Sequence, residues 1–331
     1  MKIAIYETQP WEREYLSSRL AGQEAVFPAA GEEAAPDTEV ICNFLDFRVD
    51  AETLNKFPKL KLVATRSTGF DHIDLAACAA KGVAVCNVPT YGENTVAEFA
   101  FALLLALSRK LYPALKRVKE EGLFSTDGLQ GFDLKGRTLS VIGTGHIGTC
   151  VVQIAKGFGM TVLAYDPYPR PDLAAQYGFT YKDLDAVLGE ADAVTLHVPY
   201  MPQTHHLINA EKLKLFKPGS VLINTARGGL VDTDALAAAL ESGTGLAGAA
   251  LDVLEEEGFI KDEIHLLAQS HPNEQELKTA LADHRLMQMP NVLVTPHNAF
   301  NTKEAVMRIL DTTVQNIVSF SQDKPINLVK S

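Results

Sequence analysis

This sequence of 331 residues lacks any long hydrophobic run. No stretch approaches the ~20 consecutive apolar residues that span a membrane, so we expect no membrane contact. The start of the chain, residues 1–6, enters a strand pattern directly, without the ~7–15-residue apolar core of a secretory signal peptide. The expected location is therefore the cytoplasm.

The sequence also has fewer basic than acidic residues. Lysine and arginine number 30 against 41 acidic residues, which gives a formal net charge of −11. Because nucleic-acid backbones are bound by basic stripes, this balance disfavours a nucleic-acid partner. A small anionic substrate would need a local cation of its own.

Cysteine is rare, and Cys42, Cys78, Cys86 and Cys150 lie far apart in apolar contexts with no CxxC pair. We interpret them as reduced packing residues rather than as zinc ligands or disulfide partners. The nine histidines show no HxxxH spacing. The sequence therefore predicts no metal site.

What the sequence does contain is two series of short apolar strands that alternate with helical patterns, which is typical of parallel α/β sheets. The first series predicts strands at residues 2–6, 40–44, 60–64 and 83–88 and helices at 11–20 and 73–80. The second predicts strands from 138 and at 161–165, 193–198, 221–225, 247–253 and 291–295, with helices at 147–158 and 232–240. A last helix is expected at 303–319.

The most informative motif is Gly143-Thr-Gly145-His-Ile-Gly148, which follows a predicted strand and opens a predicted helix. The first glycine permits a tight turn, the second lets backbone approach a pyrophosphate, and the third allows close packing of helix and strand. The helix N-terminus offers unpaired N–H groups to the anion. This pattern predicts a dinucleotide-binding loop.

Asp166 ends the next predicted strand, eighteen residues after Gly148. That spacing is close to the ~20 residues expected for the acid that binds the adenosine ribose. Its carboxylate would repel a 2′-phosphate, which favours NAD over NADP. Arg170, four residues later, is a cation that weakens this selection.

The position of the glycine motif in mid-chain predicts an inserted domain. An unbroken apolar helix at residues 95–108 and a glycine-containing connector at 112–136 precede the motif. We expect residues 1–105 and 298–331 to form a discontinuous substrate domain and residues 106–297 a Rossmann domain, with a cleft between the two. The polar residues 255–286 are interpreted as a solvated surface excursion.

Candidate catalytic residues follow three strands of the second series, at the sheet edge where ligands of such sheets bind. Arg227, followed by Gly228-Gly229, supplies a guanidinium that can grip a carboxylate with two hydrogen bonds. His297 follows Thr295-Pro296 and can exchange a proton near neutral pH. A carboxylate from residues 252–257 would raise the pKa of that imidazole, and spacing leaves open which acid does so. We interpret the other histidines, His205 and His206 included, as inert.

These stretches resemble the D-isomer-specific 2-hydroxyacid dehydrogenase family, most closely its D-lactate dehydrogenase branch. The matching segments are residues 66–74, 87–98, 143–148, 217–232 and 295–297. The resemblance implies an NAD-dependent enzyme that reduces a small 2-oxo acid, with pyruvate preferred, to the D-2-hydroxy acid. It also implies that Arg227 orients the substrate, that His297 is the acid and base, and that Glu257 pairs with His297.

Further ligand contacts and a homodimer formed through the inserted domain are implied by the resemblance. The implied cofactor contacts, besides the three glycines, are His146, Ile147, Asp166, Val198, Pro199, Thr204, Thr225, Ala226, Arg227 and Asp252. The implied substrate contacts, besides Arg227 and His297, are the backbone N–H groups of Thr68 and Gly69 and the nearby Tyr91.

Two alternatives stay open. The first is a binding protein that senses NAD(H), like the transcriptional co-repressors of the same family, although Arg227, Glu257 and His297 are all present. The second lies within the enzyme class and is a 2-hydroxyisocaproate dehydrogenase or a hydroxypyruvate or glyoxylate reductase.

Overall fold

The computed structural model describes residues 1–243, 245–255 and 274–329. The chain divides into two compact units, which are Met1–Tyr91 with Asn301–Ser331 (unit 1) and Gly92–Phe300 (unit 2). Each unit contains one sheet, and every pairing between the named strands of both sheets is parallel. The expected α/β class with two parallel sheets is confirmed.

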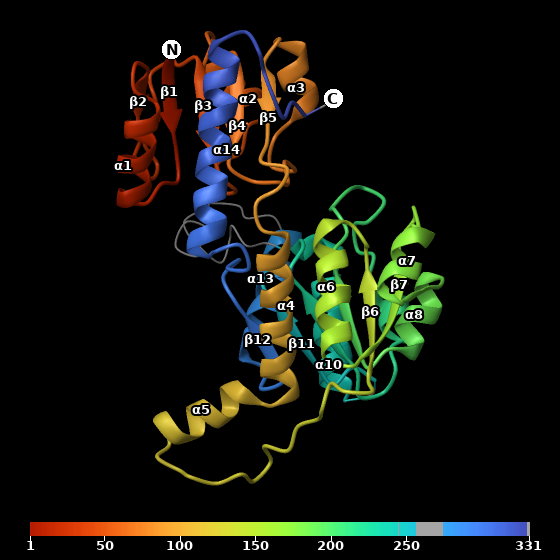
Figure 1. Ribbon diagram of the computed structural model, residues 1–331. Helices are drawn as coiled ribbons and strands as arrows, with labels where there is room; N and C mark the ends of the chain where they lie inside the picture. Colours follow the sequence, from red (N-terminus) through yellow and green to blue (C-terminus); the bar gives the residue numbers. More distant parts are fainter. Residues whose placement is uncertain (244, 256–273, 330–331) are drawn as a thin grey trace. The chain divides into compact units, whose positions relative to one another are not determined.

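Unit 1 is built on a five-stranded sheet of order β2-β1-β3-β4-β5 (Figure 1). Its strands are β1 (Lys2–Ile5), β2 (Glu24–Val26), β3 (Val40–Asn43), β4 (Leu62–Thr65) and β5 (Ala84–Cys86). Its helices are α1 (Pro10–Arg19), α2 (Ala51–Lys56), α3 (Leu75–Ala80) and α14 (Lys303–Ser321). The last of these returns from the end of the chain and packs against β4 and α1. The sequence patterns did not predict β2 or α2, which are only three and six residues long.

Unit 2 is built on a seven-stranded sheet of order β12-β11-β10-β9-β6-β7-β8. The strands are β6 (Thr138–Ile142), β7 (Thr161–Tyr165), β8 (Thr180–Tyr181), β9 (Ala193–Leu196), β10 (Val221–Asn224), β11 (Gly248–Leu251) and β12 (Val292–Val294). Strand β6 lies between β7 and β9, so the strand order reverses at β6. Ligands of open α/β sheets bind at such a reversal, outside the carboxyl ends of the strands.

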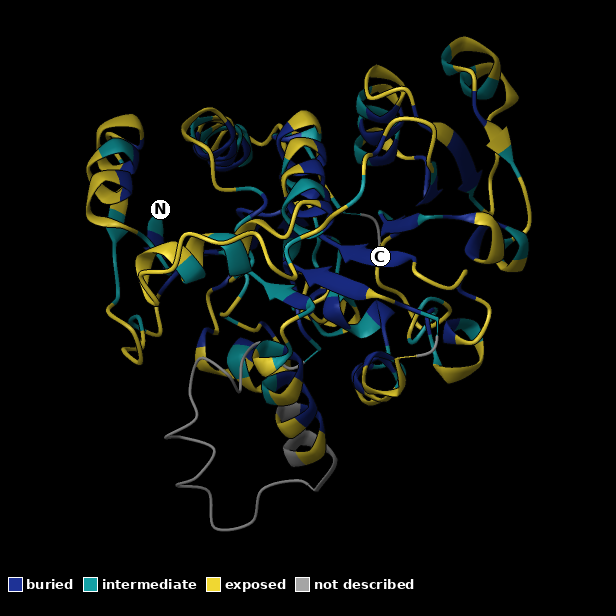
Figure 2. Ribbon diagram, turned by 90° about the horizontal axis from the view of Figure 1, so that it is seen from below, coloured by how far each residue is buried: buried dark blue, intermediate teal, exposed yellow. Residues whose placement is uncertain are grey.

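Helices cover this sheet and bury its strands, as the dark blue strands of Figure 2 show. They are α4 (Glu93–Ser108), α5 (Leu111–Lys119), α6 (His146–Gly157), α7 (Pro171–Tyr177), α8 (Leu184–Glu190), α9 (Ala210–Leu213), α10 (Thr233–Ser242) and α13 (Glu274–Gln288). None of the helices in the described residues is long and apolar enough to cross a membrane.

Packing assigns residues 92–105 to unit 2, whereas the sequence analysis places the domain boundary after residue 105. The reason lies in α4, which packs against α6, β10 and β11. Its buried Ala97, Phe101 and Leu104 belong to the same hydrophobic cluster as Val141 and Val151 of unit 2. The functional division into a substrate domain and a cofactor domain stays a prediction.

Two segments that the sequence analysis expected to be irregular contain helices. Helix α5 occupies the start of the expected connector at 112–136, because the glycines of that connector all follow Lys119. Helix α13 occupies the end of the expected surface excursion at 255–286, where Ala282 and Leu286, four residues apart, are buried. It packs against α10 and β12. Residues 256–273 lie outside the described residues.

A histidine follows β9 at the reversal of the strand order. The backbone N–H of His197 donates to the carbonyl of Ile142 (2.7 Å), and its Nε2 lies 2.8 Å from Thr195 Oγ1. Burial lowers the pKa of His197 to about 3. The imidazole is therefore neutral at pH 7, consistent with an inert packing role.

We predict that His197 makes the stability of unit 2 depend on pH. An unfolded chain binds a proton at this histidine below pH ~6.5, whereas the folded chain does so only near 3, so stability falls as the pH drops from ~6.5. The slope from this group approaches about 1.4 kcal/mol per pH unit. Urea unfolding at pH 7, 6 and 5 should show a shallower slope in His197→Asn than in wild type. Equal slopes in the two proteins would contradict this assignment, and His284→Asn serves as the control.

Candidate active site

The glycine loop connects β6 to α6, and two of its positions have no room for a side chain. Gly143 has a φ of 95°, and a Cβ at this position would lie 2.7 Å from the carbonyl oxygen of His197. A Cβ on Gly148 would lie 1.9 Å from the carbonyl oxygen of Gly143. Since real Cβ atoms do not approach backbone oxygen so closely, both positions require glycine. The predicted roles of these two glycines in the turn and in close packing fit the geometry.

The middle glycine faces open space. Gly145 has a φ of −64°, and a Cβ there would meet no atom within 4 Å. It is the N-cap of α6 and supplies no side-chain cap, which leaves the first N–H groups of the helix, including those of His146 and Ile147, for another acceptor. Free N–H groups at a helix N-terminus, with room beside them, fit a bound pyrophosphate.

Asp166 lies directly beside this loop. Its Oδ2 accepts hydrogen bonds from the backbone N–H of Thr144 (2.7 Å) and from Thr144 Oγ1 (2.9 Å). The end of β7 and the middle of the glycine loop are thereby joined, and the role of Asp166 beside the adenosine ribose stays a prediction. The sequence analysis did not single out Thr144, although it stands between the first two glycines.

The loop after β9 contributes three more predicted cofactor contacts. Val198 is buried, and its Cγ1 lies against Gly143. The carbonyl of Pro199 accepts a hydrogen bond from Thr204 Oγ1 at 2.8 Å. Val198, Pro199 and Thr204 therefore belong to one loop whose base packs on the glycine turn.

The turn after β10 holds Arg227 in place through Asn224. The Asn224 side chain donates to the carbonyl of Arg227 (2.8 Å) and accepts from the N–H of Ala226 (3.0 Å). Between them, Thr225 Oγ1 is buried and has no hydrogen-bond partner in the described part of the chain. A buried hydroxyl without a partner fits a site that a polar ligand completes. Asn224 was not predicted to have a role, because an asparagine at a strand end carries no specific signal.

Asp252 follows β11 and is 1% exposed. Its carboxylate accepts hydrogen bonds from Thr295 Oγ1 (2.5 Å) and from the N–H groups of Asn298 and Ala299 (both 2.8 Å). Burial raises the pKa of Asp252, and these three hydrogen bonds act in the opposite direction. The side chain is therefore an anchor for the turn after β12. Its implied contact with the cofactor stays a prediction.

His297 lies within the turn that Asp252 anchors. Its backbone N–H donates to the carbonyl of Asp252 at 2.8 Å, and its φ of 50° is in the left-handed region. Such a conformation costs a non-glycine residue about 1–3 kcal/mol and persists only where the surrounding structure holds it. The half-buried imidazole lines a groove of about 680 Å³ and is therefore accessible from outside the protein.

The acids of the 252–257 stretch differ in where the chain places them. Glu257, the predicted partner, lies outside the described residues. Glu256 also lies outside them. Of the two acids of this stretch that the structure describes, Asp252 holds the turn, and Glu255 Oε1 lies 2.6 Å from Nε2 of His206. The ring of His206 stacks on that of His205 at 3.8 Å. His206 is thus one half of a carboxylate–histidine pair that the sequence analysis did not foresee.

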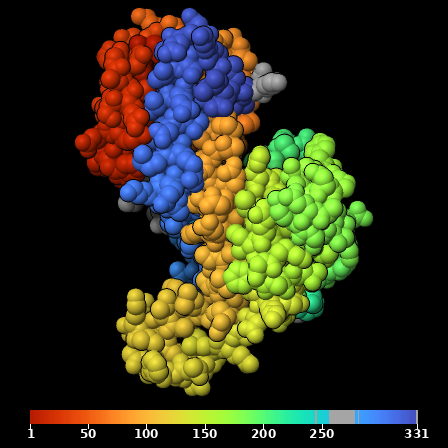
Figure 3. Space-filling model, in the orientation of Figure 1, coloured from red at the N-terminus to blue at the C-terminus, as the bar shows by residue number. Residues whose placement is uncertain are grey.

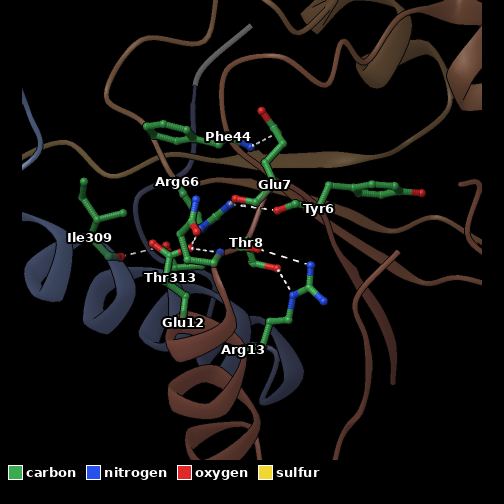
Figure 4. Close-up of polar contacts among 10 residues, drawn as sticks. Tyr6, Glu7, Thr8, Glu12, Arg13, Phe44, Arg66, Ile309 and Thr313 are labelled. Atoms are coloured by element: carbon green, nitrogen blue, oxygen red, sulfur yellow. Dashed lines mark hydrogen bonds and ion pairs between the residues drawn. The ribbon is translucent and has the colours of Figure 1, made fainter. Parts of the chain in front are cut away.

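In unit 1, Arg66 follows β4 and ties the first two residues after β1 to α1 (Figure 4). Its Nη2 donates to the carbonyls of Tyr6 (2.8 Å) and Glu7 (2.5 Å), and its Nη1 lies 3.3 Å from Glu12 Oε2. The side chains of Arg66 and Glu12 are 4% and 11% exposed. Removing one partner of such a buried pair is costly, so this pair fixes the chain that leads into Thr68.

The loop that contains Thr68 and Gly69 is held from both sides. Thr68 Oγ1 donates to the carbonyl of Val88 (2.7 Å), and Ser67 Oγ donates to the carbonyl of Gly69 (2.6 Å). The N–H groups of Thr68 and Gly69 donate to no acceptor within the described chain, so both are available to a ligand. The carbonyl of Tyr91 accepts a hydrogen bond from Arg308 Nε. Their roles as substrate contacts stay predictions.

The chain is similar to known proteins over nearly its whole length. The family model described as "D-isomer specific 2-hydroxyacid dehydrogenase, NAD binding domain" matches residues 101–299. The chain is 38% identical, over 100% of both chains, to 2-hydroxyacid dehydrogenase homolog 1 of Schizosaccharomyces pombe.

Two solved structures are similar over nearly the whole chain. The D-lactate dehydrogenase of Aquifex aeolicus, complexed with NAD and lactic acid, has a TM-score of 0.89 and 35% identity and covers 99% of both chains. The pyruvate reductase of Chlamydomonas reinhardtii has a TM-score of 0.84 and 38% identity and covers 98% of both chains.

The glycine loop offers a matched pair of substitutions. In Gly148→Ala the new methyl group collides with backbone, so we expect a loss of about 1–3 kcal/mol in unfolding free energy. In Gly145→Ala the methyl group meets no protein atom, so we expect stability to change little and NADH affinity to fall at least about tenfold, because the methyl group occupies the space beside the N–H groups. Urea unfolding and fluorescence titration with NADH measure the two effects. Unchanged NADH binding in Gly145→Ala would contradict the placement of the pyrophosphate.

Proposed function

The chain belongs to the D-isomer-specific 2-hydroxyacid dehydrogenase family, and from that membership we propose that it reduces pyruvate to D-lactate, with His297 as the proton donor. The cofactor is NAD. The observation that carries the proposal is the hydrogen-bonded connection between three neighbouring strand ends. The N–H of Asp252 donates to the carbonyl of Asn224, and the N–H of His297 donates to the carbonyl of Asp252.

In this proposal the protein's residues bind the acid, orient it and supply a proton. NADH, when bound, supplies the hydride. The guanidinium of Arg227 grips the substrate carboxylate and neutralises charge that develops on the carbonyl oxygen. Protonated His297 donates its proton to that oxygen, with Glu257 as the proposed carboxylate partner.

Pyruvate is proposed as the preferred substrate on the strength of the relatives. The A. aeolicus protein binds lactic acid, and the C. reinhardtii protein is a pyruvate reductase. Arg227 and His297 follow strands of the same sheet as the glycine loop, and their presence supports an enzyme rather than a protein that only senses NAD(H). The four free cysteines fit a reducing compartment, and we propose the cytoplasm.

We predict that His297→Ala loses pyruvate reduction and keeps NADH binding. General acid catalysis contributes roughly 10²–10⁴ in rate, so kcat should fall by about that factor. The fluorescence titration of NADH should give a Kd within a few-fold of wild type. His284→Ala, on α13, is the matched control and should keep full activity.

The same assay tests the substrate assignment when it is extended to 2-oxoisocaproate, hydroxypyruvate and glyoxylate. The chirality of each chiral product is determined as well. If kcat/KM is higher for one of these acids than for pyruvate, that acid is the preferred substrate. Full activity of His297→Ala would remove His297 from the mechanism. A wild-type protein that binds NADH and reduces none of the four acids would favour the NAD(H)-sensing alternative.

We further propose a homodimer formed through α5. Apolar residues of this helix and of the segment that follows it are at least about half exposed: Leu111, Tyr112, Leu115, Val118, Leu123 and Phe124, the last at 98%. The segment is nevertheless held in place, because Arg117 Nη1 donates to the carbonyls of Ser125 and Asp127. Figure 3 shows it as a projecting body at the end of α4. Exposed apolar patches on an ordered element favour a protein interface.

The dimer proposal predicts twice the chain mass of 35.9 kDa in analytical ultracentrifugation. Leu115→Asp combined with Phe124→Asp places charges in the apolar patch and should shift the mass toward a single chain. Lys119→Asp, at the end of the same helix, controls for charge alone. A wild-type monomer, or a double variant that remains dimeric at micromolar concentration, would overturn this interface.

A further inference from the structure

We propose that Arg170 forms a 2′-phosphate subsite beside the adenosine ribose, so that the protein accepts NADPH as well as NADH. The inference rests on the placement of the cofactor at the glycine loop and goes beyond it. It concerns the loop of residues 166–171, which follows β7 and leads into α7.

Arg170 is fixed against the glycine loop. Its Nη2 donates to the carbonyl of Thr144 at 2.6 Å and lies 3.5 Å from Thr149 Oγ1. Prolines 169 and 171 flank it, and its own carbonyl accepts the first hydrogen bonds of α7. Pro171 restricts the backbone of Arg170, and the bond to Thr144 already orders its side chain. The guanidinium therefore loses little freedom when it binds an anion.

Most of the guanidinium is unused by the protein. Its Nε and Nη1 donate to no acceptor in the part of the chain that the structure describes, and the residue is exposed. Arginine presents five N–H donors in a planar fork that matches phosphate geometry. A phosphate on the ribose 2′-oxygen beside Asp166 and Thr144 therefore has a prepared cation within the same loop.

Asp166 is a weaker barrier to that phosphate than the sequence analysis expected. Its Oδ2 accepts two hydrogen bonds from Thr144, and its Oδ1 accepts one from the N–H of Tyr168 (2.9 Å). A carboxylate offers about four acceptor sites, so about one remains for the two ribose hydroxyls. Strong selection for NAD depends on hydrogen bonds from both ribose hydroxyls to this carboxylate. Asp166 can accept both only if it loses one of its present hydrogen bonds.

The charges of the loop also favour binding of a 2′-phosphate. Asp166 contributes one negative charge and Arg170 one positive charge, and both side chains contact Thr144. The repulsion that Asp166 alone exerts on a phosphate of charge −1.5 to −2, an approximate range at pH 7, is offset by this cation. We therefore expect a preference for NADH over NADPH of about tenfold or less, rather than exclusion of NADPH.

Binding of nucleotide fragments tests the subsite without turnover. Isothermal titration of the full chain with 5′-AMP and with adenosine 2′,5′-bisphosphate gives two Kd values, and NADH and NADPH give two more. In wild type the bisphosphate should bind at least as tightly as 5′-AMP. In Arg170→Ala the ratio of the bisphosphate Kd to the 5′-AMP Kd should rise about tenfold or more, because charge-assisted hydrogen bonds to phosphate are lost.

Two further variants keep the test specific. In Arg170→Lys this Kd ratio should lie between those of wild type and Arg170→Ala, since lysine keeps the positive charge and lacks the planar fork of donors. Lys182→Ala removes an exposed cation of the same unit, paired with Glu190, and should leave the ratio unchanged.

The outcomes distinguish failure of the 2′-phosphate subsite from failure of the cofactor placement. A wild-type protein that binds 5′-AMP and NADH but neither of the 2′-phosphorylated compounds overturns the subsite alone. An equal loss for both fragments in Arg170→Ala also overturns it, because Arg170 then only supports the loop. A wild-type protein that binds none of the four compounds overturns the cofactor placement and the subsite together.

Discussion

The buried carboxylate of Asp252 is the interaction on which the candidate active site depends. It lies at the carboxyl end of β11 and accepts hydrogen bonds from Thr295, Asn298 and Ala299. Those bonds close the turn after β12 around His297 and hold its backbone in the left-handed region. Burying a charge is costly unless it is hydrogen-bonded, and here the same bonds that satisfy the charge position the histidine.

A second constraint is steric and lies in the glycine loop after β6, where the strand order reverses. Gly143 and Gly148 leave no room for a Cβ, whereas Gly145 faces open space. The two tight glycines bring β6, β9 and α6 together, and the open one leaves the N-terminus of α6 accessible. The protein thus presents a glycine loop with an accessible helix N-terminus and a separately anchored turn that holds His297, both at the carboxyl edge of one sheet.

The sequence predicted the features that depend on local pattern. Strand β7 has the predicted bounds, and the glycines occupy the predicted turn, because apolar runs and glycine spacing are local signals. The pattern did not predict α13 or the pairing of Glu255 with His206, since both depend on packing between distant segments. Likewise, spacing could not distinguish among the acids at 252–257, and only the structure identifies Asp252 as the anchor of the turn.

The most direct test of this account is the rate of a single turnover in Asp252→Asn, measured by mixing the NADH-bound protein with pyruvate and following the nicotinamide absorbance. The amide presents donors toward the N–H groups of the turn, so the account predicts a displaced His297 and a rate at least about 100-fold below wild type. The protein is saturated with NADH in this measurement, so a change in cofactor affinity does not enter the rate. A variant that folds, binds NADH and turns over at the wild-type rate would contradict the central role of Asp252.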